Sequence, residues 1–296
     1  MKIGLTGASG LIGSALVPAL RADGHEVVRF VRRPADDADE RRWDGEHLAP
    51  EAVADLGAVV HLAGAGVADH RWTSSYQQQV LQSRVRGTGA VARAVAAAGT
   101  PVLLSASAVG FYGDTGDRVT DETGPRGEGF LAELCEAWEA ATAPAEQGAR
   151  VAHLRTGIVL SGKGGALGKQ RPLFRAGLGA PLGSGRQWLP WISLQDEVAA
   201  IRHLLTADVA GPVNLVAPAP VTNREFTKAL GAQLHRPTAP VAVPRFVLRA
   251  VLGDFADEGV LLGQRLVPAV LERSGFSFAH PDLRSALRAA LASPAR

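Results

Sequence analysis

The chain has 296 residues, of which 46% are hydrophobic. Its formal net charge is only +2 and its basic residues are spread along the sequence, which disfavours a nucleic-acid partner. No apolar run reaches the roughly 20 residues that a membrane span needs, and the histidines show no metal-ligand spacing. A single cysteine and an N-terminus without a signal peptide pattern predict a cytoplasmic protein. We further expect a globular monomer or homodimer with a small-molecule substrate and no metal.

The N-terminal part alternates between short apolar strands and amphipathic helices. Residues 2–6 predict a strand, 11–22 a helix with one apolar face, and 26–31 a second strand, which completes a βαβ unit. The alternation continues with a strand at 58–62, a helix at 76–98 and a strand at 101–105. This order predicts an α/β fold with a doubly wound parallel sheet.

The second half is less regular and suggests a smaller lobe. Its predicted elements are a loop at 114–129, a helix at 130–143, a strand at 151–160, strands at 191–193 and 213–216 around a helix at 196–205, and helices after 222. Eight glycines between residues 162 and 185 predict a mobile, loop-dominated segment. We expect a Rossmann-type α/β domain at 1–160, to which 188–218 returns, and a smaller, mainly helical substrate lobe at 161–296.

A glycine-rich turn joins the first strand to the first helix. Gly7, Gly10 and Gly13 suit a tight turn, close approach of a pyrophosphate, and packing of the helix on the sheet. The amides at the start of the helix face the phosphates. The turn therefore predicts a dinucleotide site formed by Gly7, Ser9, Gly10, Leu11, Ile12 and Gly13.

Two arginines predict which dinucleotide binds. About 20 residues after the last glycine, an acid selects the ribose hydroxyl of NAD, whereas an arginine accommodates a 2′-phosphate. Arg32 and Arg33 occupy this position, and Asp36 and Asp37 come only after Pro34. We expect NADP(H) as the cofactor, the alternative being that the arginines form an exposed turn.

Further motifs resemble a known family. The segments His61-Leu62-Ala63-Gly64, Ser105-Ala106-Ser107 and Tyr112-Gly113 resemble an extended or atypical short-chain dehydrogenase/reductase. Phe111 to Gly116, Pro190-Trp191-Ile192 and Gly263-Gln264-Arg265 are similar to its nucleoside-diphosphate-sugar epimerase-like subgroup, which has a helical tail domain. The resemblance implies that Leu62, Ala63, Gly64 and Ser105 contact the cofactor.

The resemblance also implies a catalytic tyrosine with a lysine four residues later, and this YxxxK pair is missing. The chain's two tyrosines are followed at that spacing by Val80 and Gly116, and Leu131 and Cys135 take the places of the pair. Ser107, with Ser105 as the alternate, matches the serine that polarises the substrate carbonyl. Tyr112 either donates a proton or lines the pocket passively.

Substrate contacts are expected near the strand ends, from Arg155, Gln187 and Trp188. Arg155 alternatively pairs with an acid such as Asp121 or Glu122. Two functions remain: an NADP(H)-dependent oxidoreductase or epimerase acting on a small carbonyl or hydroxyl, possibly of a sugar nucleotide, or a catalytically silent NADP(H)-binding regulatory or interaction protein. A polar pocket beside the nicotinamide favours the first, and one filled by Phe111, Leu131 or Trp188 favours the second.

Overall fold

The main sheet carries the strands that the N-terminal pattern predicts. A computed structural model describes residues 1–292, and within them seven strands form this sheet in the order β10-β6-β5-β4-β1-β2-β3. The strands are β1 (Lys2–Thr6), β2 (Glu26–Val31), β3 (Glu40–Arg42), β4 (Ala58–His61), β5 (Val102–Ala108), β6 (Arg150–Thr156) and β10 (Gly211–Leu215). The pairs β1–β2, β1–β4, β2–β3 and β4–β5 are parallel. The chain order reverses between β1 and β4, which is where such sheets bind ligands.

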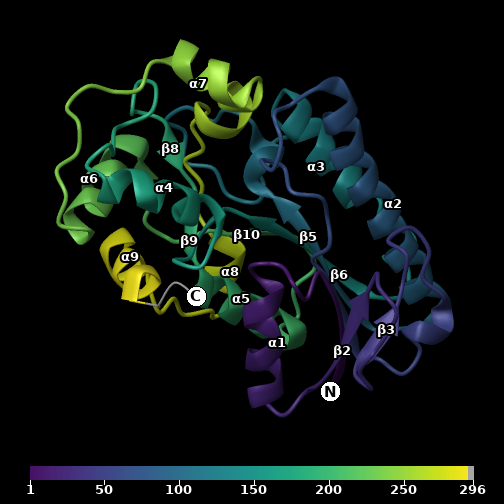
Figure 1. The fold of residues 1–296 in the computed structure, drawn as a ribbon. Helices are drawn as coiled ribbons and strands as arrows, with labels where there is room; N and C mark the ends of the chain where they lie inside the picture. Colours follow the sequence, from purple (N-terminus) through teal and green to yellow (C-terminus); the bar gives the residue numbers. More distant parts are fainter. Residues whose placement is uncertain (293–296) are drawn as a thin grey trace. The chain divides into compact units, whose positions relative to one another are not determined.

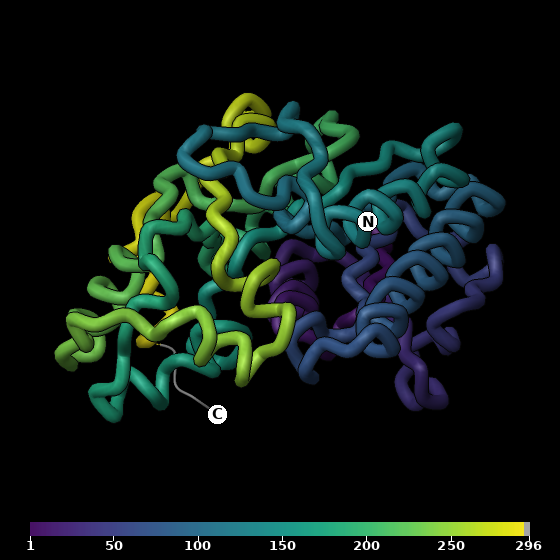
Figure 2. The backbone as a smooth tube through the Cα atoms, turned by 90° about the horizontal axis from the view of Figure 1, so that it is seen from above, coloured from purple at the N-terminus to yellow at the C-terminus, as the bar shows by residue number. Residues whose placement is uncertain are grey.

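Helices cover both faces of this sheet, as a doubly wound fold requires. They are α1 (Gly13–Ala22), α2 (Ser74–Ala98), α3 (Phe130–Ala140) and α5 (Leu194–Thr206), with the 3₁₀ turn η1 (Pro50–Ala52). A second 3₁₀ turn, η2 (Val109–Tyr112), follows β5 along the chain. Figure 1 shows α1 and α5 on one face and α2 and α3 on the other. The long helix α2 can be followed as the blue coil in the backbone trace of Figure 2.

The chain divides into two compact units that interleave along the sequence. The first comprises Met1–Ala108, Leu134–Arg155 and Val198–Val213, and the second comprises Val109–Glu133, Thr156–Glu197 and the chain from Asn214 onward. The first unit contains the glycine-rich turn and most of the main sheet. The functional division predicted near residue 160 stays a prediction.

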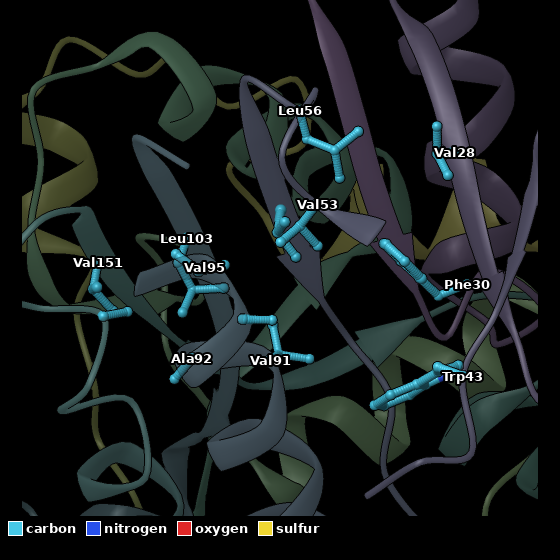
Figure 3. Packing of buried hydrophobic residues seen from close by; sticks show 13 residues of the cluster. Val28, Phe30, Trp43, Val53, Leu56, Val91, Ala92, Val95, Leu103 and Val151 are labelled. Carbon is cyan, nitrogen blue, oxygen red and sulfur yellow. The ribbon is translucent and has the colours of Figure 1, made fainter. Parts of the chain in front are cut away.

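The first unit has its own hydrophobic core between the sheet and α2. Val28 and Phe30 of β2, Leu103 of β5, and Val91 and Val95 of α2 are buried there (Figure 3). Strands with both faces covered require nearly continuous apolar sequence, and β4 satisfies this with four buried residues. This burial, which removes apolar surface from water, holds the ends of β1, β4 and β5 in fixed positions.

The second unit is mainly helical with two small sheets. The helices are α4 (Gly165–Arg175), α6 (Asn223–Gln233), α7 (Arg245–Leu252), the π-helix η3 (Ala256–Val260), α8 (Ala269–Arg273) and α9 (Leu283–Ala292). The sheets pair β7 (Ile158–Leu160) with β9 (Trp191–Ser193), and β8 (Trp188–Leu189) with β11 (Val221–Thr222). No helix among residues 1–292 combines the length and apolarity that crossing a bilayer requires.

One sequence expectation in this region is wrong, and one helix there is not predicted by the sequence. The strand expected at 151–160 is broken at Gly157, where the backbone N–H donates to Leu215 and the chain turns to pair with β9. The sequence predicts no helix in the segment 162–185, yet α4 occupies 11 of its 24 residues, and the rest lies outside helices and named strands. Leu167 and Phe174, seven residues apart, lie on one helical face and are buried in the core of the second unit, which outweighs the low helix propensity of the glycines.

Candidate functional site

The glycine-rich turn between β1 and α1 forms an open cradle of backbone amides. Gly7 adopts a φ of +70°, and the Gly10 N–H donates to the Gly7 carbonyl at 3.0 Å, which closes the turn. A Cβ on Gly13 would lie 2.8 Å from the Ala8 Cα and closer still to the Gly7 oxygen, so only glycine fits there. Ser9 and Gly10 are exposed at the start of α1, where orphan N–H groups and the helix dipole attract anions.

One hydroxyl connects this turn to the segment that follows β4. The Thr6 Oγ1 accepts hydrogen bonds from the Leu62 and Ala63 N–H groups at 3.1 and 3.2 Å, and it lies 2.8 Å from the His61 Nδ1. A Cβ on Gly7 would lie 2.8 Å from the Leu62 carbonyl carbon, so the two segments are also in close contact. The predicted cofactor residues of both segments are therefore held side by side in the first unit.

Arg32 and Arg33, the two arginines predicted to bind the 2′-phosphate of NADP(H), have different surroundings. Arg33 pairs with the buried Glu40 of β3 at 2.6 Å and with Asp36 at 2.7 Å. The Asp36 N–H also donates to Glu40, so this carboxylate organises the turn after β2. Arg32 is exposed and has no hydrogen bond or ion pair within the described residues. The structure thus leaves Arg32 available to a ligand and uses Arg33 to hold the turn.

Ser107, the predicted catalytic serine, belongs to a buried polar network at the carboxyl end of β5. Its Oγ donates to the Glu139 Oε1 at 2.6 Å. Arg155 at the end of β6 donates to both oxygens of Glu139, each at 2.8 Å. Ser105, the alternate, is also buried, opposite His61 in the register of β4 and β5. Arg155 thus has an acidic partner other than the two expected from sequence.

Glu139 lies on α3, the helix to which the family resemblance assigns the place of the missing tyrosine–lysine pair. Leu131, Cys135 and Glu139 are spaced by four residues along α3 and therefore share one face. Burial raises the pKa of the Cys135 thiol to about 12, so it is neutral near pH 7 and does not replace the lysine cation. Glu139 is the ionisable side chain nearest to Ser107 on this face, and sequence reasoning missed it.

The remaining predicted site residues belong to the second unit, where each side chain has a bonding partner. The Tyr112 hydroxyl is buried and donates to the Asn214 Oδ1 at 2.7 Å. The Gln187 amide donates to the Leu182 carbonyl at 3.0 Å, and the Trp188 ring N–H donates to Asp117 at 2.8 Å. These bonds favour packing roles, and the catalytic and substrate roles of the three residues stay predictions.

A doubly wound parallel sheet with a glycine-rich turn at its topological switch defines a Rossmann-type dinucleotide-binding protein, as the sequence predicts. The chain belongs to the NAD dependent epimerase/dehydratase family, whose model matches residues 3–216. A domain of unknown function, DUF1731, matches residues 243–290. The predicted family resemblance and fold class are confirmed.

Three related proteins support this assignment along nearly the whole chain. Epimerase family protein Mb2239 of Mycobacterium bovis is 51% identical, with 99% of this chain and 98% of that protein covered. The crystal structure of human epimerase family protein SDR39U1 (isoform 2) with NADPH is 32% identical, with a TM-score of 0.90 over 99% of this chain and 100% of that chain. The nucleoside-diphosphate sugar epimerase from Corynebacterium glutamicum is 35% identical, with a TM-score of 0.82 over 98% of this chain and 58% of that chain.

Proposed function

We propose that this protein is an NADP(H)-dependent enzyme of the short-chain dehydrogenase/reductase type, acting on a small carbonyl or hydroxyl substrate such as a sugar nucleotide. The glycine cradle with the unpaired Arg32 beside it is the observation that carries the proposal. The human relative crystallised with NADPH and the bacterial relative described as a nucleoside-diphosphate sugar epimerase support the cofactor and the substrate class. When bound, the cofactor supplies or accepts a hydride.

The residues present fit NADP(H). The cradle offers backbone amides and a helix N-terminus to the pyrophosphate, and a Cβ at Gly13 would clash with the backbone of the turn that presents them. Arg32 follows β2 and offers an unpaired guanidinium to a 2′-phosphate, which arginine binds through two parallel hydrogen bonds. The acid that would select NAD is absent from the end of β2.

An Arg32→Ala variant is expected to bind NADPH at least about 10-fold more weakly, because one charge-assisted contact is lost. Its affinity for NADH is expected to stay within about twofold, since NADH has no 2′-phosphate. Both dissociation constants are measurable by titrating the fluorescence of the reduced nicotinamide. Arg33→Ala is the comparison: it leaves Glu40 without one partner and is expected to lower the melting temperature. An equal loss of affinity for NADPH and NADH in Arg32→Ala would contradict the role of Arg32 in binding the 2′-phosphate.

Ser107 and Glu139 provide a route for the substrate proton in place of the missing pair. Because the Ser107 proton is directed at Glu139, the serine oxygen presents its lone pairs to a substrate hydroxyl. When that hydroxyl becomes a carbonyl, its proton moves to the Ser107 Oγ as the serine proton moves to the Glu139 Oε1. Carbonyl reduction runs the same two transfers in reverse. Arg155 holds the carboxylate in place with its two hydrogen bonds.

The reaction is tested by incubating the protein with C4-deuterated NADPH and a panel of carbonyl compounds and sugar nucleotides. We expect deuterium in at least one product by mass spectrometry. A Ser107→Ala variant is expected to transfer about 100-fold or more slowly, which is the scale of a lost acid–base contribution, while its NADPH affinity stays unchanged. If the protein binds NADPH yet transfers no label across a broad panel, the alternative of a catalytically silent binder is favoured.

A further inference from the structure

Arg84 is a buried cation on α2 that the proposed function does not use. It is 7% exposed, and one guanidinium nitrogen donates to the Val80 carbonyl at 3.2 Å. Its Nε has no hydrogen-bond partner, and no carboxylate pairs with Arg84 among residues 1–292. Burial lowers the pKa of Arg84, yet an arginine stays charged near neutral pH. A charge removed from water without a counter-ion is costly, so this position attracts an anionic or lone-pair-rich group.

The groups around Arg84 do not supply this counter-charge. The guanidinium lies over the Trp138 ring, 4.7 Å from its centroid. Cys135 and Tyr76 lie near the guanidinium, but neither supplies a negative charge. Burial raises the pKa of the Cys135 thiol to about 12, and the Tyr76 hydroxyl donates a hydrogen bond to the Gly66 carbonyl. The aromatic ring compensates only part of the cost through its negative face.

Arg84 is also placed beside a segment of the cofactor site. A Cβ on Gly64 would lie 3.4 Å from the guanidinium carbon, so this glycine leaves room for the arginine. The preceding Ser83 accepts a hydrogen bond from the Ala65 N–H at 3.2 Å, which fixes the segment against α2. The same segment contacts the glycine-rich turn through Thr6. Arg84 therefore lies at the carboxyl end of β4, where parallel sheets of this type bind ligands.

We propose that Arg84 binds the nicotinamide mononucleotide half of NADP(H), with its guanidinium donating to the ribose and phosphate oxygens of that half. The inference rests on the proposed function and deepens it. The two ends of the cofactor would then each have an arginine: Arg32 at the adenosine end and Arg84 at the nicotinamide end. The position of the missing lysine is held by the neutral Cys135, so Arg84 is the cation beside it.

The test compares NADPH with 2′,5′-ADP, which has the 2′-phosphate but no nicotinamide half. Dissociation constants are measured by calorimetry on the full chain. Arg84→Met is expected to weaken NADPH binding at least about 10-fold and to leave 2′,5′-ADP binding within about twofold. Arg84→Lys, which keeps the charge on a different donor, is expected to give a smaller loss of NADPH affinity only. Arg32→Ala is the matched control and is expected to weaken both ligands.

Four outcomes separate the possibilities. If folded Arg84→Met binds NADPH as the wild type does, the inference is wrong and Arg84 only packs on Trp138. An equal loss of both ligands also overturns it, because it indicates distortion of the whole site. If Arg84→Met does not fold, Arg84→Lys is compared instead: a loss of NADPH affinity without a loss of 2′,5′-ADP affinity supports the inference, and any other result overturns it. Failure of the wild type to bind either ligand would instead contradict the proposed function.

Discussion

A Gly13→Ala variant is expected to bind NADPH at least about 100-fold more weakly than the wild type, which corresponds to about 2.7 kcal/mol. The added Cβ would overlap the backbone of Gly7 and Ala8, so the turn has to move away from the start of α1. That movement misdirects the amides that are proposed to hold the pyrophosphate. The affinity is measurable by nicotinamide fluorescence, together with the melting temperature.

Gly148→Ala is the matched control for this variant. Gly148 is an exposed glycine of the same unit, and a Cβ placed on it meets no atom within 4 Å. The control is expected to keep both NADPH affinity and stability, since alanine reduces the conformational freedom of the unfolded chain without a clash. Unchanged NADPH binding in folded Gly13→Ala would show that the turn does not hold the cofactor.

A Glu139→Ala variant is expected to lower the free energy of unfolding by about 3–5 kcal/mol, because it leaves the Arg155 charge buried without this partner. The Arg155 side chain is 5% exposed and the Glu139 side chain 11%, so water compensates little for the lost carboxylate. The bond from Ser107 is lost as well. Urea unfolding followed by circular dichroism measures the change.

Glu133→Ala serves as the control, since Glu133 is an exposed acid on the same helix. A change within about 0.5 kcal/mol is expected there, as for other surface positions. Glu139→Gln keeps the shape of the side chain and is expected to be less destabilised than Glu139→Ala. If Glu139→Ala unfolds like the wild type, the Ser107–Glu139–Arg155 network does not stabilise the first unit.

The main sheet, apart from the three-residue strand β3, could be predicted because its short apolar strands alternate regularly with amphipathic helices. The alternation of residues 2–6, 11–22 and 26–31 reflects burial of β1 and β2 against α1, and local pattern and tertiary packing agree there. The sequence does not predict helix α4, because the many glycines of this segment indicate a loop more strongly than the helical spacing of Leu167 and Phe174 indicates a helix. The break at Gly157 depends on pairing with a strand more than 30 residues later, which periodicity does not reveal.

The glycine-rich turn could be recognised from the sequence because its residues are contiguous, whereas the polar network could not. Glu139, Ser107 and Arg155 come from α3, β5 and β6, and only the fold brings them together. The one available signal for Glu139 was its place one turn beyond Cys135 on α3. The segment Ser83-Arg84-Val85 also resembles the epimerase-like subgroup, but the sequence assigns Arg84 no role, and its burial in the structure is what draws attention to it.

The bond between Thr6 and His61 makes the junction of the two cofactor segments sensitive to acid. Because the Thr6 oxygen accepts two amide hydrogens, its own proton points to His61 Nδ1, and the imidazole proton of the neutral ring lies on Nε2. Burial lowers the pKa of His61 from 6.5 to about 4. Between pH 6.5 and about 4, His61 is protonated in the unfolded chain but stays neutral in the folded chain. The free energy of unfolding therefore decreases as the pH is lowered through this range. Protonated Nδ1 would no longer accept from Thr6, and acidification is therefore expected to weaken the contact between the glycine-rich turn and β4.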